Sequence, residues 1–452
     1  MNGGIRARLQ AVRATYWFVP GIMALLAILL GAVMIWLDVR LGSGWIKGIS
    51  WYQQIRADGA REVLSTIAGS MITVAGVVFS ITIVALSYAS SQYGPRVLTN
   101  FMSDRGNKIT LGTFIATFLY CLMVLRTIRG GDDDFVPQYS VVVAMLLAVC
   151  SIGVLIYFIH HVPQSIHINN VVARIGEQLV ADTCKRFPAM IGSAAEEPEQ
   201  DRPPALEGTI VSVPSKATGY IQSIDQERLL RLACEGGALI RLRYRPGDFV
   251  MAGLIVADVA AGERWDDSCT NALDGCFTVG RKRAPDSDLM FLVSELVEIA
   301  ARALSPGIND PMTAVTCLDW LGAGALETAS RKLPRAVRVD PGGTPRVIAR
   351  PDDFASFIAC SFGRVRDYAA RDPIASLHFL RVLGEVATGC RLESQIGTIS
   401  AEAARFAEVA VGQLRGAAAR SVQERAEELQ AFLSRGIGRI DSTHVEWLGG
   451  SA

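Results

Sequence analysis

The chain of 452 residues carries 44 basic and 44 acidic side chains, so its formal net charge is zero, and half of its residues are hydrophobic. A neutral chain lacks the broad positive field that attracts nucleic acid, so nucleic acid is excluded as a partner. The nine cysteines are scattered without a CxxC pair, which predicts reduced thiols and excludes a disulfide framework or a zinc site.

Four uncharged apolar stretches precede residue 160 and predict four membrane-spanning helices. They lie between Arg13 and Asp38, between Glu62 and Arg96, between Lys108 and Arg126, and between Asp134 and His160. Each reaches the roughly 17–25 residues that a spanning helix needs. Basic residues gather before the first stretch, between the second and third, and after the fourth. The positive-inside rule then predicts a multi-pass protein of the bacterial inner membrane with both termini in the cytoplasm.

The second stretch, residues 65–91, is uncharged but rich in Ser, Thr, Gly and Ala. Alternating steps of three and four residues stay on one face of a helix. Along such a face, small polar residues occupy almost every position and are interrupted only by Ile83. The polar stripe, our set of candidate pore-lining residues, consists of Thr66, Gly69, Thr73, Gly76, Ser80 and Ser87. Arg96 follows as the candidate residue of a cytoplasmic mouth.

Two interpretations of the polar stripe stay open. Small residues let membrane helices approach closely, and the pairs Gly69–Thr73 and Gly76–Ser80 have the required spacing. Alternatively, hydroxyl groups along the whole helix line a hydrated path for ions at the axis of a homo-oligomer. No charged residue lies inside the stretch, which argues against a proton-coupled transporter.

The sequence predicts a transmembrane domain at residues 1–162, followed by three further segments. Residues 163–205 form an amphipathic connector helix and a proline-rich linker, in which Pro163 interrupts the helical register. The histidines beside Pro163 have no carboxylate close to them in the sequence, so we expect no metal site there. Residues 206–283 alternate as short strands of a small β-barrel or sandwich-like module, and residues 284–452 are mainly helical, with a hairpin at Gly342 and Gly343. The fold class expected is a four-helix membrane domain followed by a cytoplasmic α+β domain.

The most distinctive soluble motif is "ALSPGINDPMTA". Ser305 precedes a proline and is therefore expected to lie outside the preceding helix. Gly307 can adopt a positive φ to turn the chain. Asn309 or Asp310 can cap the next helix, with Pro311 in its first position. These residues form either a structural loop or a ligand-binding loop, and capping and turn formation account for most of them.

Two long motifs carry a family resemblance. The stretches "IAARALSPGINDPMTAV" and "YASSQYGPRVLTNFMSDRGNK" resemble signatures of a bacterial family of predicted membrane proteins, domain of unknown function 2254. The resemblance implies membrane helices followed by a cytoplasmic domain. It implies no activity and no substrate.

The expected function follows from the absence of known catalytic motifs and from the polar stripe. It contains no Ser–His–Asp set, P-loop or HExxH motif, so we expect neither an enzyme nor a bound cofactor or metal. The main hypothesis is a homo-oligomeric, channel-like protein whose second helix lines the axis, with the lipid bilayer, further copies of itself and ions as partners. The alternative is a membrane-anchored sensor or scaffold that acts through its cytoplasmic domain.

Overall fold

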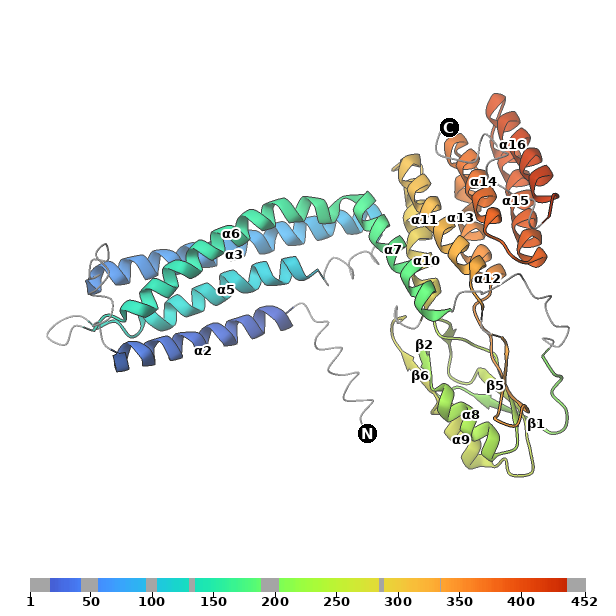
Figure 1. Cartoon of the computed structure of the whole chain (residues 1–452), viewed down its shortest axis with the longest axis horizontal. Helices are drawn as coiled ribbons and strands as arrows, with labels where there is room; N and C mark the ends of the chain where they lie inside the picture. Colours follow the sequence, from blue (N-terminus) through green and yellow to red (C-terminus); the bar gives the residue numbers. More distant parts are fainter. Residues whose placement is uncertain are drawn as a thin grey trace. The chain divides into compact units, whose positions relative to one another are not determined.

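The computed structural model describes residues 17–41, 56–94, 104–129, 135–187, 203–283, 288–333 and 335–436. The chain divides into two compact units, Met1–Val171 and Val172–Ala452. Both are drawn in Figure 1.

The first unit contains four helices that are long and apolar enough to cross a membrane, which confirms the four expected spans. They are α2 (Phe18–Leu41), α3 (Ala57–Tyr93), α5 (Arg105–Leu125) and α6 (Gln138–Ile166). The 37 residues of α3 extend over about 55 Å, more than the hydrocarbon thickness of about 30 Å. Helix α3 ends before Gly94, which adopts a φ of 104°.

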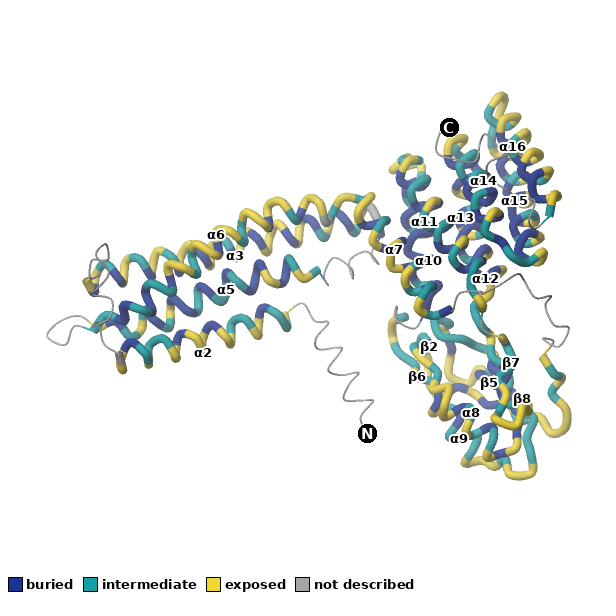
Figure 2. The backbone as a smooth tube through the Cα atoms, viewed as in Figure 1, coloured by how far each residue is buried: buried dark blue, intermediate teal, exposed yellow. Residues whose placement is uncertain are grey.

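Helix α5 is the packing centre of the first unit. Of its apolar segment 50% is buried, against 28% for α3 and 17% each for α2 and α6. It contacts all three of these helices, and Figure 2 shows its buried positions in dark blue. Phe114, Tyr120 and Val124 are among its buried side chains. Each outer helix therefore buries one face and leaves the opposite face exposed on the unit.

A carboxylate on α2 caps α6 from outside that helix. Asp38 accepts hydrogen bonds from the main-chain amides of Tyr139 and Ser140, at 2.9 and 3.0 Å, and from the Ser140 hydroxyl at 2.5 Å. These two amides belong to the first turn of α6, where no carbonyl of the same helix can accept them. A negative charge is also favoured at a helix N-terminus. Asp38 thereby fixes the end of α2 against the start of α6.

The end of α6 differs from the expectation. Pro163 lies inside the helix, which continues to Ile166, so the predicted interruption at this proline is wrong. A carboxylate also lies near the histidines: Oδ1 of Asp104, the N-cap residue of α5, is 3.2 Å from Nε2 of His161. The two residues are 57 positions apart, which is why the sequence around His161 did not reveal the pair. In the part of the chain that the structure describes, no group of three side chains is placed to hold a metal ion.

The second unit combines two small sheets with a set of helices. Its elements are α7 (Ile168–Arg186), β1 (Ile210–Pro214), β2 (Gly219–Ile224), α8 (Gln226–Glu235), β3 (Leu239–Leu242), β4 (Phe249–Val250), β5 (Ile255–Ala260), α9 (Asp267–Asp274), β6 (Phe277–Gly280), α10 (Leu289–Ala303), α11 (Pro311–Ser330), β7 (Val337–Val339), β8 (Pro345–Ile348), α12 (Phe354–Cys360), α13 (Phe362–Ala369), α14 (Pro373–Thr388), α15 (Glu393–Gln413) and α16 (Ala417–Leu433). This arrangement confirms the expected class of membrane helices followed by an α+β domain.

The strands form a five-stranded sheet, β1-β5-β3-β8-β7, and a three-stranded sheet, β4-β2-β6. The hairpin β7–β8 is present as expected, and Gly343 in its turn has a φ of 81°. It joins the first sheet through a parallel pairing of β8 with β3, in which Val347 lies opposite Ile240. The helices α8 and α9, which the sequence reading missed, pack Leu229 and Leu273 into the core of this module.

The helical part of the second unit has an aromatic core. Phe379 stacks on Phe406 with ring centroids 3.9 Å apart and meets Phe362 edge-on at 5.2 Å.

The same helices also contain a buried ion pair. The buried carboxylate of Glu402 accepts two hydrogen bonds from the guanidinium of Arg366, at 2.8 and 2.7 Å. One face of α10 is buried, and it includes Leu289, Leu292, Leu296, Ile299, Ala300 and Ala303.

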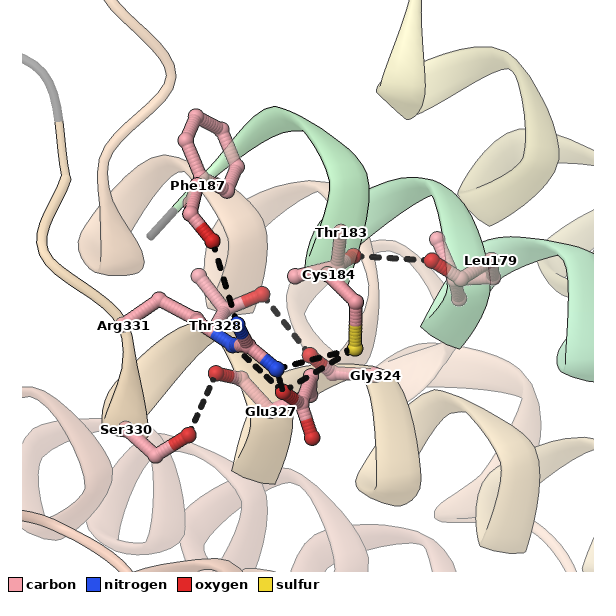
Figure 3. Close-up of polar contacts among 9 residues, drawn as sticks. All are labelled: Leu179, Thr183, Cys184, Phe187, Gly324, Glu327, Thr328, Ser330 and Arg331. Atoms are coloured by element: carbon pink, nitrogen blue, oxygen red, sulfur yellow. Dashed lines mark hydrogen bonds and ion pairs between the residues drawn. The ribbon is translucent and has the colours of Figure 1, made fainter. Parts of the chain in front are cut away.

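From Val172 onward, α7 is a packed helix of the second unit. Gly176 lies against Trp320 of α11, and a Cβ at that position would overlap the indole ring. Figure 3 shows the polar contacts near the end of α7. There the Cys184 thiol donates to Glu327 at 3.2 Å, and Arg331 binds both Glu327 and the main-chain carbonyl of Phe187. Burial raises the pKa of the Cys184 thiol, and its bond to Glu327 acts in the same direction, so this thiol remains protonated and serves as a donor.

We predict that Asp38→Ala destabilises the membrane unit by about 1–3 kcal/mol, because the amides and the hydroxyl that it binds would lose their acceptor inside the protein. Thermal unfolding of the purified protein in detergent measures the change. Asp58→Ala is the matched control, since Asp58 is exposed in the first turn of α3. Equal unfolding midpoints for the two variants would contradict the capping role of Asp38.

Candidate functional site

Helix α3 carries two faces of small residues, and among the described residues only one of them packs against other helices. The buried face contains six alanines, Ala57, Ala60, Ala68, Ala75, Ala85 and Ala89. It packs against α5 and α6 together with larger side chains such as Leu64 and Val78. Alanine lets helix backbones approach closely. Close packing within one chain is therefore provided by this alanine face.

The polar stripe lies on the opposite side of α3. All six of its residues are exposed in the single chain. At Gly69 and Gly76, apart from the neighbouring residues and nearby backbone of α3 itself, no described atom lies within 4 Å of the position that a Cβ would take. These glycines thus make no close contact with another helix that the structure describes. The packing interpretation of the stripe can apply only to a contact with another copy or another protein.

Two hydroxyl groups of the stripe, those of Thr73 and Ser80, are satisfied as donors inside α3. Thr73 donates to the carbonyl of Gly69 at 2.8 Å, and Ser80 donates to that of Gly76 at 2.9 Å. Such bonds to the preceding turn lower the cost of a hydroxyl in an apolar environment. The hydroxyl oxygen keeps its acceptor lone pairs, which can face water or an ion. The stripe therefore tolerates lipid during insertion and can still solvate a hydrated path.

Apolar side chains border the stripe on both sides. Ile72 and Phe79 lie along one edge, and Val77 and Val84 lie along the other, all exposed. A shallow groove of about 740 Å³ between α3 and α6 includes Ser80 and is otherwise lined mostly by apolar residues. The polar surface of α3 is hence a narrow line with apolar margins, which suits a helix that contacts neighbouring copies at its edges.

Arg96, the candidate residue of the cytoplasmic mouth, lies outside the described residues. The structure therefore bears on the six stripe residues and on the loop at 305–310.

The loop between α10 and α11 forms a tight turn, but not in the way expected. The main-chain carbonyl of Ser305 accepts hydrogen bonds from the amides of Ile308 and Asn309, at 3.1 and 2.9 Å. The residue with a positive φ is Asn309, at 49°, so the expectation of a positive φ at Gly307 is wrong. Asparagine tolerates this conformation better than most residues with a side chain.

The end of the same loop confirms the predicted cap. Asp310 is the N-cap residue of α11 and accepts from the amide of Thr313 at 3.1 Å and from its hydroxyl at 2.5 Å. Pro311 occupies the first helical position. The Ser305 hydroxyl donates to the carbonyl of Arg302 at 2.6 Å, which satisfies a carbonyl at the end of α10. Ser305, Asn309 and Asp310 each have a structural role, and a ligand role for this loop stays a prediction.

We predict that Asp310→Ala lowers the free energy of unfolding by about 1 kcal/mol, because the first turn of α11 loses its acceptor. Gly307→Ala should be close to neutral, since its surroundings are open and its φ is not positive. Asn309→Val should cost about 1–2 kcal/mol, because a β-branched side chain disfavours a positive φ. Denaturant unfolding of the three variants tests this order. A larger cost for Gly307→Ala than for Asn309→Val would contradict the observed backbone.

Comparison with known proteins places the chain in a family. The family model described as a predicted membrane protein (DUF2254) matches residues 13–385. Uncharacterized proteins of Mycobacterium bovis and Mycobacterium tuberculosis are 30% identical over 395 residues, which cover 85% of this chain and 74% of each relative. No solved structure matches the chain. The chain belongs to the DUF2254 family of predicted membrane proteins.

Proposed function

We propose that the protein is a homo-oligomeric, channel-like membrane protein in which the polar stripe of α3 faces an axis shared by several copies. One observation carries this proposal: the stripe is exposed in the single chain, while a separate alanine face supplies the packing within it. Symmetric assembly around a closed axis is the usual form of a homo-oligomer, and it brings the same face of every copy together.

A monomer surrounded by lipid gives no physical reason for the stripe. Large apolar side chains partition into the hydrocarbon core more favourably than Gly, Ser or Thr do. Small residues are useful where another helix approaches or where a water-filled path needs room. Both uses require a neighbour, and none of the helices in the described part of the chain lies against Gly69 or Gly76.

The length of the stripe favours a path over a local contact. From Thr66 to Ser87 it covers about 32 Å along the helix axis, close to the thickness of the hydrocarbon core. Two helices that cross at an angle touch closely only near their crossing point. Hydroxyl acceptors along the full thickness of the membrane are needed only where water or an ion travels through it.

We further propose that the protein lies in the bacterial inner membrane with both termini in the cytoplasm, that ions pass along the stripe, and that the second unit regulates this passage without being an enzyme. The basic residues of the loops support this orientation. The alternative is a membrane-anchored sensor or scaffold that acts through the second unit. The observation that favours this alternative is a charged cavity in that unit.

We predict that Thr73→Leu and Ser80→Leu each abolish or strongly reduce ion flux into liposomes while the oligomer keeps its mass. Leucine is well tolerated in a membrane helix, but it narrows and dewets a path that it faces. Ile81→Leu, at an exposed apolar position of the same helix, is the control and should leave flux unchanged. Wild-type flux in both stripe variants would refute the pore. Loss of the oligomer would instead place the stripe in a tight interface between copies.

Cysteine labelling tests the same face independently. Thr73→Cys and Ser80→Cys should react with a small charged thiol reagent in water, whereas Val78→Cys, on the buried face, should not. The native Cys121 and Cys150 are first replaced, because they lie in the membrane helices as free thiols. Protection of all three positions would contradict a hydrated axis and support the scaffold.

A further inference from the structure

The second unit contains a cavity of about 450 Å³ that none of the predicted sites includes. It lies where the end of α7, the start of α8, the strands β3, β7 and β8, and the segment before α12 meet. Its volume is within the range of sites that hold small organic ligands. Six charged side chains line it: Arg186, Arg245, Arg338, Arg350, Glu227 and Asp352.

The charge of the cavity lining favours an anion. Four arginines face two carboxylates, which leaves an excess of positive charge. One carboxylate is already engaged, because Asp352 lies 2.8 Å from the guanidinium of Arg245. Arg338 and Arg350 donate to the main-chain carbonyls of Arg335 and Arg243, acceptors that carry no net charge. An anion bound between Arg338 and Arg350 would gain from both guanidinium groups.

The positions of Arg338 and Arg350 set the geometry for such an anion. Arg338 lies on β7, and Arg350 follows β8 by two residues, so one hairpin carries both. The main chain of this hairpin is fixed by antiparallel pairing and by the parallel pairing of β8 with β3. One guanidinium group can bind two phosphate oxygens at once through parallel N–H donors. A hairpin that carries two arginines of the cavity lining is therefore suited to a phosphate group.

The rest of the lining is apolar and suits a ring or a carbon skeleton. Leu230 and Val347 contribute aliphatic surface, and Tyr244 and Phe187 contribute aromatic rings. Val347 belongs to the buried core of the β module, and Leu230 and Tyr244 pack against that core, so this wall is part of the folded module. Inorganic phosphate alone would leave this apolar surface unused.

We propose that this cavity binds a phosphorylated organic molecule of nucleotide size, with its phosphate groups at Arg338 and Arg350 and its ring against the wall that contains Tyr244 and Leu230. The proposal concerns the second unit alone. It holds whether or not the polar stripe conducts ions, so its failure and the failure of the channel proposal are distinguishable.

The test is isothermal titration calorimetry of the purified full-length protein in detergent with four probes: ADP, GDP, UDP and CDP. We expect at least one of them to bind with a dissociation constant in the micromolar range and to raise the unfolding temperature. Adenosine, guanosine, uridine and cytidine should bind at least tenfold more weakly than their diphosphates. Inorganic phosphate should also bind at least tenfold more weakly than the best diphosphate. The proposal is overturned if no diphosphate binds, or if inorganic phosphate or the nucleoside binds equally well.

Two variants locate the site. Arg338→Gln and Arg350→Gln should each weaken binding of that diphosphate about tenfold, because each removes a charged donor to phosphate. Arg231→Gln is the matched control, since Arg231 is exposed on α8 and is not part of the cavity lining. Unchanged affinity in both cavity variants, or an equal loss in the control, would contradict the assignment.

A third variant tests whether the diphosphate binds inside the cavity or only to the positive charge around it. Leu230→Trp keeps all four arginines but fills part of the volume, so it should abolish nucleotide binding. The unfolding temperature without ligand shows whether this variant retains the native fold, and Leu230→Met provides a milder change of the same wall. Wild-type affinity in a folded Leu230→Trp protein would show that the diphosphate binds outside the cavity.

Discussion

The membrane unit depends on the central position of α5. Helix α5 contacts α2, α3 and α6. Each of these three helices therefore packs one face against α5, and its opposite face is exposed to the surroundings of the unit. Backbone groups in the hydrocarbon core are satisfied within each helix, so the side chains of that outer face determine what can lie next to it. For α2 and α6 the outer face is mostly apolar, and lipid is sufficient. For α3 it contains the polar stripe, and lipid alone does not account for it.

The sequence was enough to find the polar stripe of α3, but it did not reveal the alanine face or show which face of the helix packs within the chain. Alanines such as Ala68 and Ala75, and stripe residues such as Thr73 and Gly76, all recur at helical spacing and are all small residues. Periodicity identifies residues that share a face, yet it does not say which face meets the rest of the chain. That choice depends on where α5 lies, which is a property of tertiary packing.

Features set by neighbouring residues could be predicted from the sequence, whereas contacts between residues far apart in the sequence could not. Asp310 and the turn at Gly343 were predictable, since a cap or a hairpin is determined by a few neighbouring residues. The cap of α6 by Asp38 joins residues about 100 positions apart, and no local pattern marks it. Gly307 and Asn309 are both residues that favour turns, so the sequence alone could not decide which one takes the positive φ.

The two proposals concern different units, and α7 is the helix that follows α6 in the chain and ends at the cavity of the second unit. A single residue, His167, separates the end of α6 from the start of α7. The far end of α7 supplies Arg186 and Phe187 to the cavity lining. A ligand shifts a conformational equilibrium only by the difference between its affinities for the two states. A ligand of the cavity can therefore act on α7 only if a change in the position of Arg186 and Phe187 changes its affinity. Because α7 is fixed to α11 at Gly176 and Cys184, such a change would have to move α7 and α11 together.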